Sequence, residues 1–336
     1  MVGPPPIDSP AGHAVRGEAV CVTGGAGFIG SHLVGALAGA GASVRVIDDL
    51  SSATSDRLTD LIEAHEGRVR FTHASILEPG AMAEASRGAR WVFHLAAMSS
   101  AAEAQEDPAR CVEVNGLGTA RVLEASRHAG VQRVVYAASA SAYGDTAGPN
   151  REDQPPAPMS PYAAGKLAGE HAIAGWARSM GVDGVSLRLF NVYGPGQSEH
   201  SPYAAVIPAF ATRLRAGLPP VIYGDGSQTR DFVHVSDVVR AMTLAAARPA
   251  PWGGIAVNIG SGRSVSIAEL ASVMARLCGE APAPPIHEPS RAGDIAASEC
   301  DPSRAEREMG FRARVTLEDG LDALLDGCRG ARREAV

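Results

Sequence analysis

Thr23-Gly24-Gly25-Ala26-Gly27-Phe28-Ile29-Gly30 follows an apolar run and opens a segment with helical periodicity. Its glycines allow the backbone to turn tightly and to approach a pyrophosphate, which then lies at the N-terminus of the helix, where N–H groups and the helix dipole favour an anion. Asp48 ends the next predicted strand, 18 residues beyond Gly30, where a carboxylate accepts hydrogen bonds from both hydroxyls of an adenosine ribose. Together these features predict a dinucleotide-binding unit.

The choice between the two nicotinamide cofactors depends on Asp48. A carboxylate at this strand end would repel a 2′-phosphate, so the sequence favours NAD over NADP. Asp49 is a second candidate acceptor for the ribose. Arg57 is the nearby cation that leaves NADP open as an alternative.

The first 190 residues alternate short apolar runs with segments of helical period, such as Ile29–Ala40 and Ala109–His128. Strands separated by helices indicate βαβ units and a parallel sheet, and continuous apolar runs are typical of strands covered on both faces. We therefore expect an α/β fold, a Rossmann-type doubly wound parallel sheet. The predicted strands are Glu18–Thr23, Ala42–Asp48, Arg68–Thr72, Arg90–Leu95, Gln132–Ala137 and Gly184–Phe190.

Beyond Phe190 the pattern becomes irregular and rich in turns. Two later strands, Arg230–Val235 and Gly254–Ile259, either rejoin the sheet or build a small second lobe. We expect residues 1–17 to form a disordered leader, and residues 18–190 with about 230–260 to form the NAD-binding domain. Residues 191–229 and 261–330 are expected to form a smaller C-terminal substrate-binding domain.

Composition excludes several classes of protein. The 336 residues carry a formal net charge of −7 and no basic stripe that could neutralise phosphates, which argues against nucleic-acid binding. No apolar stretch reaches the ~18 residues that span a bilayer, and the N-terminus lacks the pattern of a signal peptide. The five cysteines are scattered and odd in number, as expected for reduced thiols in a cytoplasmic protein. Neither they nor the histidines are spaced for a metal site.

A second chemical pattern is Ser160-Pro161-Tyr162-Ala163-Ala164-Gly165-Lys166. Ser160 is a good N-cap and proline suits the first helical position, so Tyr162 and Lys166 fall on one face of a helix that begins here. A free phenol titrates near pH ~10, and an adjacent ammonium together with an oxidised nicotinamide would lower its pKa enough for base catalysis. Ser139, at the end of the fifth predicted strand, completes a candidate catalytic set.

These motifs, with His94-Leu95-Ala96-Ala97 and the stretch from Ser139 to Tyr143-Gly144, resemble the extended short-chain dehydrogenase/reductase family. Within it the chain is similar to the nucleotide-sugar epimerases, especially the UDP-sugar 4-epimerases. The resemblance runs from about Ala19 to about Leu325. It implies NAD-dependent epimerisation at C4 of a UDP-hexose through a 4-keto sugar, in a homodimer formed through the helices Ala109–His128 and Pro161–Met180.

The resemblance also implies a role for individual residues. Ser139, Tyr162 and Lys166 match the catalytic triad: the phenolate takes the proton of the 4-hydroxyl, the serine binds O4, and the lysine binds the nicotinamide ribose. The residues implied at the cofactor are Gly24, Gly27, Phe28, Ile29, Gly30, Asp48, Asp49, Leu95, Ala96, Ala97, Asn115, Tyr162, Lys166 and Phe190. Those implied at the substrate are Ser139, Ser141, Asn191, Val206, Arg230, Arg291, Asp294 and Ser298.

Within the substrate set, Arg230 and Arg291 match two arginines that clamp the diphosphate, and Asn191 matches an asparagine that touches it. Asp294 matches an acid that binds the uridine ribose, and Val206 lies in a segment similar to the one around the uracil. Asn115 matches an asparagine that supports the active-site helix.

Two departures narrow the expected reaction. Dehydratases and decarboxylases of the family have an acidic residue directly after the active-site serine or threonine, whereas Ala140 and Ser141 stand here. Ser298 is aligned with the position that controls pocket size, and a small residue there admits N-acetylated sugars. The alternatives are a UDP-glucuronate 4-epimerase, a sugar dehydratase, or an NAD-sensing protein with a dead site, which would have a broken triad. The sugar stays open.

Overall fold

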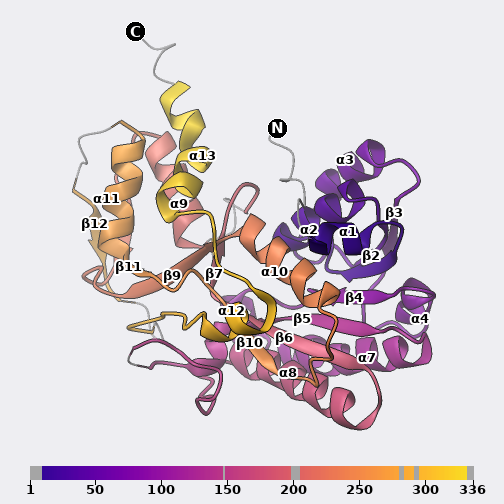
Figure 1. The fold of residues 1–336 in the computed structure, drawn as a ribbon. Coiled ribbons are helices and arrows are strands. Elements are labelled where there is room, and N and C mark those ends of the chain that lie inside the picture. Colours follow the sequence, from indigo (N-terminus) through magenta and orange to yellow (C-terminus); the bar gives the residue numbers. More distant parts are fainter. Residues whose placement is uncertain (1–9, 147, 198–204, 280–283, 291–294, 331–336) are drawn as a thin grey trace.

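A seven-stranded, all-parallel sheet forms the centre of the computed structural model, which describes residues 10–146, 148–197, 205–279, 284–290 and 295–330 (Figure 1). The strand order is β10-β6-β5-β4-β1-β2-β3, and this confirms the predicted fold class. In chain order the strands are β1 (Ala19–Thr23), β2 (Ser43–Asp48), β3 (Val69–His73), β4 (Trp91–His94), β5 (Arg133–Ser139), β6 (Asp183–Leu189) and β10 (Ala256–Ile259).

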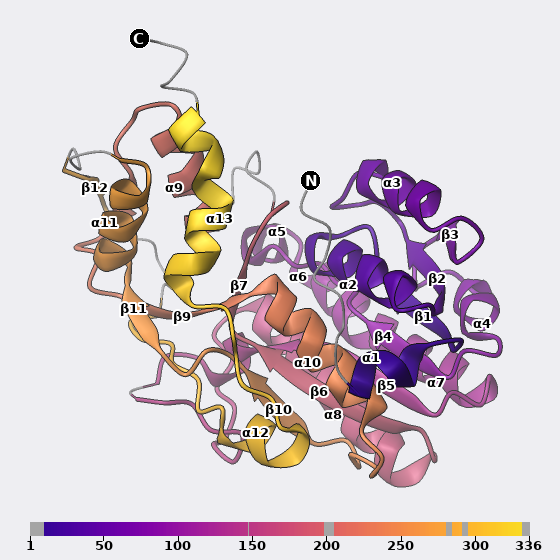
Figure 2. The ribbon, with the colours of Figure 1, turned by 45° about the horizontal axis from the view of Figure 1, so that its top comes forward.

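Helices cover both faces of the sheet. Successive strand residues point to opposite faces, so each strand contributes side chains to two cores. Val20 and Val22 of β1 pack into one core with α2 and α10, while Cys21 between them packs into a second core with α4, α7 and α8. Figures 1 and 2 show α2 and α10 on one side of the sheet and α7 and α8 on the other. These helices are α2 (Phe28–Gly39), α3 (Asp56–Ala64), α4 (Ala81–Ser86), α5 (Ala101–Glu106), α6 (Pro108–Val112), α7 (Thr119–His128), α8 (Pro161–Ser179) and α10 (Val235–Ala247).

The strand order reverses between β1 and β4, and this reversal positions the site. In open parallel sheets a crevice forms at the carboxyl ends of the strands at such a switch point. Thr23 ends β1 and His94 ends β4, so the glycine-rich turn and the segment after His94 meet at this edge.

The expectation of a disordered leader over residues 1–17 is wrong for its second half. Pro10–Val15 form the short helix α1, which packs against α10, and Val15 is fully buried in the core beside α2. Ala14 and Val15 pack into this core, and their burial stabilises the helix. Residues 1–9 lie outside the described residues.

The two later predicted strands go to different places. β10 rejoins the large sheet beside β6, whereas β9 (Thr229–His234) lies in a separate three-stranded sheet between β7 (Asn191–Tyr193) and β11 (Ser264–Ser266). Around that sheet lie α9 (Val206–Arg215), α11 (Ile267–Leu277), α13 (Leu317–Gly330) and the strand pair β8 (Val221–Tyr223) and β12 (Ile286–Glu288), while α12 (Ser303–Met309) packs on β10. The lobe has its own apolar core. No helix in the described parts of the chain is long and apolar enough to cross a membrane.

Candidate active site

The glycine-rich turn is so tight that two of its positions admit no side chain. Gly24 has a φ of +70°, and a Cβ there would lie 2.6 Å from the amide nitrogen of Ala96. A Cβ on Gly30 would lie 2.1 Å from the carbonyl oxygen of Gly24. Gly27 is the N-cap of α2 and has no side chain that could accept a hydrogen bond from the first-turn amides, which include Phe28 and Ile29. The turn therefore fits a pyrophosphate.

Asp48 ties the end of β2 to this turn. One carboxylate oxygen accepts the amide of Ala26 and the other accepts the amide of Leu50, each at 2.9 Å. Burial raises the pKa of Asp48, and the two amide hydrogen bonds lower it. Asp49 accepts hydrogen bonds from the amide and hydroxyl of Ser51 in its own loop. Asp48 is thus the acid that stands at the turn, as the ribose assignment requires.

The segment after β4 is held against the turn by Thr23. Its hydroxyl oxygen accepts the amides of Leu95 and Ala96, both at 3.2 Å. This contact brings the predicted residues Leu95, Ala96 and Ala97, all of them half-buried, to the same edge as the glycines.

A buried histidine extends this hydrogen-bond chain and was not predicted. Thr119 donates its only hydroxyl hydrogen to the carbonyl of Asn115 (2.7 Å), so it accepts from His94 Nε2 (3.0 Å). His94 Nδ1 is then the acceptor for the Thr23 hydroxyl at 2.7 Å. Burial, and to a lesser extent the charge of Lys166, lowers the pKa of His94 to about 3, so the imidazole is neutral. The chain joins the cofactor turn to the helix that carries Asn115.

That helix is interrupted where a single helix over Ala109–His128 was expected. Between α6 and α7 the residues Glu113–Gly118 form a π-helix, a device common at functional sites. It directs the buried Asn115 side chain to Met98, whose amide it accepts at 2.9 Å and to whose carbonyl it donates at 3.1 Å. Gly165 of α8 packs directly on Asn115, since a Cβ there would lie 3.0 Å from the asparagine Cβ. Asn115 therefore supports α8 and the loop after β4.

The structure brings Ser139 and Tyr162 together. The amide and the hydroxyl of Ser141 both donate to Ser139 Oγ, at 3.1 and 2.9 Å. A serine oxygen accepts two hydrogen bonds, so the Ser139 hydroxyl has its own hydrogen left to donate to the Tyr162 oxygen. Burial raises the pKa of Tyr162, and this hydrogen bond lowers it, because a donor stabilises the phenolate.

Lys166 lies one helical turn beyond Tyr162 and is almost fully buried. Its Nζ donates to the carbonyl of Ala137 at 2.8 Å and lies 5.1 Å from the centre of the Tyr136 ring. Burial lowers the pKa of Lys166 to about 8. The ammonium is thus fixed by one carbonyl and one ring, and its remaining N–H groups can serve a ribose.

Glu170, eight residues after Tyr162, is a further residue that was not predicted. It accepts Arg188 Nε at 2.9 Å and Nη2 at 2.6 Å, and the Arg188 guanidinium lies 4.7 Å from the ring centre of Tyr143. This buried fork joins the catalytic helix to β6 and to the turn after Ser139. The spacing of Tyr162, Lys166 and Glu170 on one helical face is the signal that could have found it.

Ser141→Ala tests the hydrogen-bond order around Ser139. Loss of one donor frees a lone pair on Ser139 Oγ, which can then accept the Tyr162 hydroxyl and so stabilise the neutral phenol. We expect kcat to fall about three- to tenfold, the size of one hydrogen bond. The acidic limb of the pH profile should move to higher pH, because the Tyr162 pKa rises. Steady-state rates across pH measure both, and an unchanged limb would contradict the assignment.

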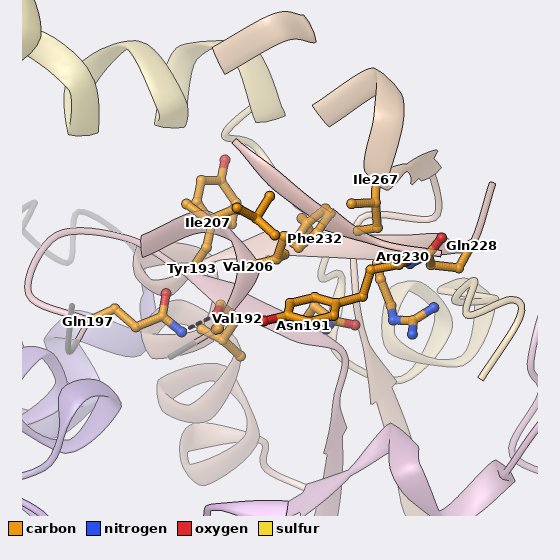
Figure 3. Close-up of a pocket in the computed structure, with 13 residues that line it drawn as sticks. Asn191, Val192, Tyr193, Gln197, Val206, Ile207, Gln228, Arg230, Phe232 and Ile267 are labelled. Atoms are coloured by element: carbon orange, nitrogen blue, oxygen red, sulfur yellow. Dashed lines mark hydrogen bonds between the residues drawn. The ribbon is translucent and has the colours of Figure 1, made fainter. Parts of the chain in front are cut away.

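A pocket of about 220 Å³ lies beside the small sheet of the second lobe (Figure 3). Three of the predicted substrate residues, Asn191, Val206 and Arg230, line it. Arg230 and Gln197 stand at opposite ends, with apolar side chains such as Phe232 between them. The other lining residues were not among the predicted site residues; they are Val192, Tyr193, Gln197, Ala205, Ile207, Val221, Tyr223, Gln228, Phe232 and Ile267.

Arg230 is oriented by backbone carbonyls. Its Nη1 donates to the carbonyls of Thr229 and Ile295, both at 2.8 Å. Ser298 lies next to it, because its amide donates to the carbonyl of Thr229, and Ser298 is buried. The predicted residues Arg291 and Asp294 lie outside the described residues.

Phe190 is buried beside the catalytic turn. It packs against Tyr143, with ring centres 6.4 Å apart, and shares a small cluster with Cys300. Its predicted place near the nicotinamide stays a prediction.

Comparison with known proteins identifies the family. The model of the NAD dependent epimerase/dehydratase family matches residues 20–260. A UDP-glucose 4-epimerase of Mycolicibacterium smegmatis is 40% identical over 305 residues, which cover 89% of this chain and 95% of that protein.

Solved structures agree with this match. A UDP-glucose 4-epimerase from Thermotoga maritima with UDP-glucose is 34% identical, with a TM-score of 0.86 over 94% of this chain and 99% of that one. A UDP-N-acetylglucosamine 4-epimerase from Methanobrevibacter ruminantium, in complex with UDP-N-acetylmuramic acid, is 32% identical, with a TM-score of 0.85 over 96% and 100%. The chain therefore belongs to the NAD dependent epimerase/dehydratase family, and its cofactor is NAD.

Proposed function

We propose that this protein inverts the configuration at C4 of a UDP-hexose through a transient 4-keto sugar. The candidate substrates are UDP-glucose/galactose and UDP-GlcNAc/GalNAc. The observation that carries the proposal is the Ser139 hydroxyl directed at the Tyr162 oxygen, at the edge of the sheet where the glycine turn lies. The two named 4-epimerase structures and the 40% identical UDP-glucose 4-epimerase support the same reaction.

The chain's own groups divide the work of proton transfer and orientation. Tyr162 takes the proton of the 4-hydroxyl and later returns it, while Ser139 hydrogen-bonds O4 of the sugar and helps to relay the proton. Lys166 orients the cofactor ribose. When bound, NAD supplies the hydride acceptor, and the positive charge of its oxidised ring favours the phenolate that burial alone disfavours.

Substrate anchoring is assigned to the second lobe. Arg230 is assigned to the diphosphate, because it lines this pocket and a planar guanidinium matches phosphate oxygens with parallel N–H donors. Asn191, which lines the same pocket, is assigned to assist it, and Val206 is assigned to the base. Anchoring the non-reacting part keeps the ketone in place while it turns its other face to the cofactor.

Assembly and location belong to the same proposal. Val112 and Leu117, on the α6–π-helix segment, are 46% and 47% exposed, and these apolar side chains favour a homodimer through this segment and α8.

A cytoplasmic location is supported by Cys21, Cys111, Cys278 and Cys300, which are buried and form no disulfide among the described residues.

The experiment that tests the reaction is a panel of nucleotide sugars incubated with the purified protein and followed by proton NMR. Inversion at C4 with no loss of water or carbon dioxide is expected. A dehydrated or decarboxylated product would favour the alternatives, and an inverted UDP-glucuronate would identify the uronic acid as substrate. No reaction with any UDP-hexose would refute the proposal.

Ser298→Tyr tests the assignment of pocket size. The serine is buried beside Arg230, so a phenol ring there would fill space that an acetamido group needs. We expect kcat/KM for UDP-GlcNAc to fall at least tenfold relative to that for UDP-glucose, a difference of about 1.4 kcal/mol. Ser298→Ala is the control and should keep the ratio. Equal loss for both sugars would contradict a role in selecting the sugar.

A further inference from the structure

A short turn of the second lobe contacts the cofactor lobe at its adenosine side. Gly194-Pro195-Gly196 follows β7, whose three residues line the substrate pocket. The carbonyl of Pro195 is 2.8 Å from Nε2 of His32 in α2. Gly196 lies so close to Arg57 of α3 that a Cβ on it would be 2.3 Å from the Arg57 Cζ. Two side chains of the first lobe thus contact one turn of the second.

The contact lies beside the part of the cofactor site that is assigned to the adenosine half of NAD. α2 begins at the glycine turn and α3 begins after the loop that follows Asp48, so both helices start at the carboxyl edge where the adenosine half of NAD is assigned. His32 and Arg57 lie in the first two turns of these helices. The Gly194–Gly196 turn therefore spans the starts of both helices that surround the pyrophosphate and ribose positions.

Two glycines allow the turn to pack this closely against its neighbours. Gly196 has a φ of +80°, which favours glycine, and a Cβ on Gly194 would lie 2.6 Å from Val235 Cγ1. Burial lowers the pKa of His32, with the charge of Arg57 acting in the same direction and the bond to Pro195 opposing both. The imidazole is thus neutral at pH 7, and because a carbonyl only accepts, the hydrogen lies on Nε2.

We propose that His32 and Arg57 are NAD-retaining residues: they hold the Gly194–Gly196 turn across the adenosine end of the cofactor site, and NAD leaves only when this contact opens. This gives Arg57 a role other than binding a 2′-phosphate. The inference rests on the family's NAD and not on the proposed sugar reaction, so its test needs no substrate and its failure leaves the epimerase proposal standing.

The test is the rate at which NAD leaves the holoenzyme. The purified protein is diluted into a coupled enzyme that consumes free NAD, and release is followed by absorbance. His32→Ala and Arg57→Ala should each release NAD about three- to tenfold faster, as expected for one lost contact, and the double variant faster still. His32→Gln should restore the wild-type rate, because the amide nitrogen can reach the same carbonyl.

Arg70→Ala is the matched control, since Arg70 is an exposed arginine of β3 in the same lobe. Its release rate should equal that of the wild type. Hydrogen exchange of the amides at residues 194, 196 and 197 in NAD-free protein distinguishes local opening of the turn from a general loss of stability. Faster exchange there in the alanine variants, with wild-type exchange in β5, supports the proposal. Unchanged release from the double variant, or faster exchange throughout the chain, overturns it.

Discussion

Tyr162→Phe is expected to lower kcat by ~10²–10⁴-fold, the usual contribution of a positioned acid–base group. The phenylalanine keeps the ring but removes the oxygen to which Ser139 donates, so no group remains to take the proton of the 4-hydroxyl. Stability should change little, because only one hydrogen bond is lost. Rapid-quench or steady-state NMR assays of C4 inversion measure the effect.

Binding measurements provide the control for this variant. Tyr162→Phe should retain NAD and should bind UDP as the wild type does, since Arg230 and the glycine turn lie on other elements. The loss should therefore appear in kcat and not in KM. Turnover within a few-fold of the wild type would show that another group acts as the base.

The pH dependence of the residual rate shows whether the pH-dependent limb belongs to Tyr162. Burial raises the Tyr162 pKa and the Ser139 hydrogen bond lowers it. Because the phenolate is the base, the wild-type rate should rise with pH through this pKa. A Phe variant lacks the group, and its residual rate should lose that limb. Retention of the limb in the Phe variant would assign it to a different residue.

The parts of the site that could be predicted from the sequence are those encoded locally. The glycine turn, the strand ends at Asp48 and Ser139, and the cap at Ser160 each depend on a few neighbouring residues. Their side chains are brought together by the parallel sheet, which places all carboxyl strand ends at one edge. Ser139, Tyr162 and Lys166 were therefore predictable as a group.

The parts that could not be predicted depend on partners distant in the chain. The π-helix around Asn115 is stabilised by its contacts to Met98 and Gly165, and helical periodicity cannot reveal one extra residue in a turn. In the sequence His94 is simply the last residue of an apolar strand. Its role becomes visible only in the structure, where it is hydrogen-bonded to Thr23 and Thr119. Tertiary contacts decide both features.

The second lobe shows the same limit. A strand over Arg230–Val235 was predicted, but its short partners β7 and β11 carry three residues each, too few to show a period. From the sequence, Arg57 was considered only as a possible ligand of a 2′-phosphate. Its contact with Gly196 could not be predicted, because the two residues are 139 positions apart. The pocket is accordingly the least predictable part of the site.

Gly30→Ala should have the largest effect on the cofactor site. Its Cβ would lie 2.1 Å from the carbonyl oxygen of Gly24, a backbone atom that can move only if the turn opens. Inserted atoms in a closely packed site cost about 1–3 kcal/mol of unfolding free energy, and here the cost falls on the NAD-binding turn. We expect a lower Tm and a purified protein with little or no NAD, as read from its absorbance after denaturation.

Gly39→Ala in the same helix is the matched control, because its Cβ has only one neighbour within 4 Å, the His65 ring at 3.9 Å. Alanine is the better helix former by up to ~1 kcal/mol, so this variant should be neutral or more stable and should keep its NAD. Helix propensity alone would favour alanine at both positions. The opposite signs expected for the two substitutions therefore isolate the steric demand of the turn. A Gly30→Ala protein that kept full NAD content would show that the turn tolerates a wider geometry than its atoms indicate.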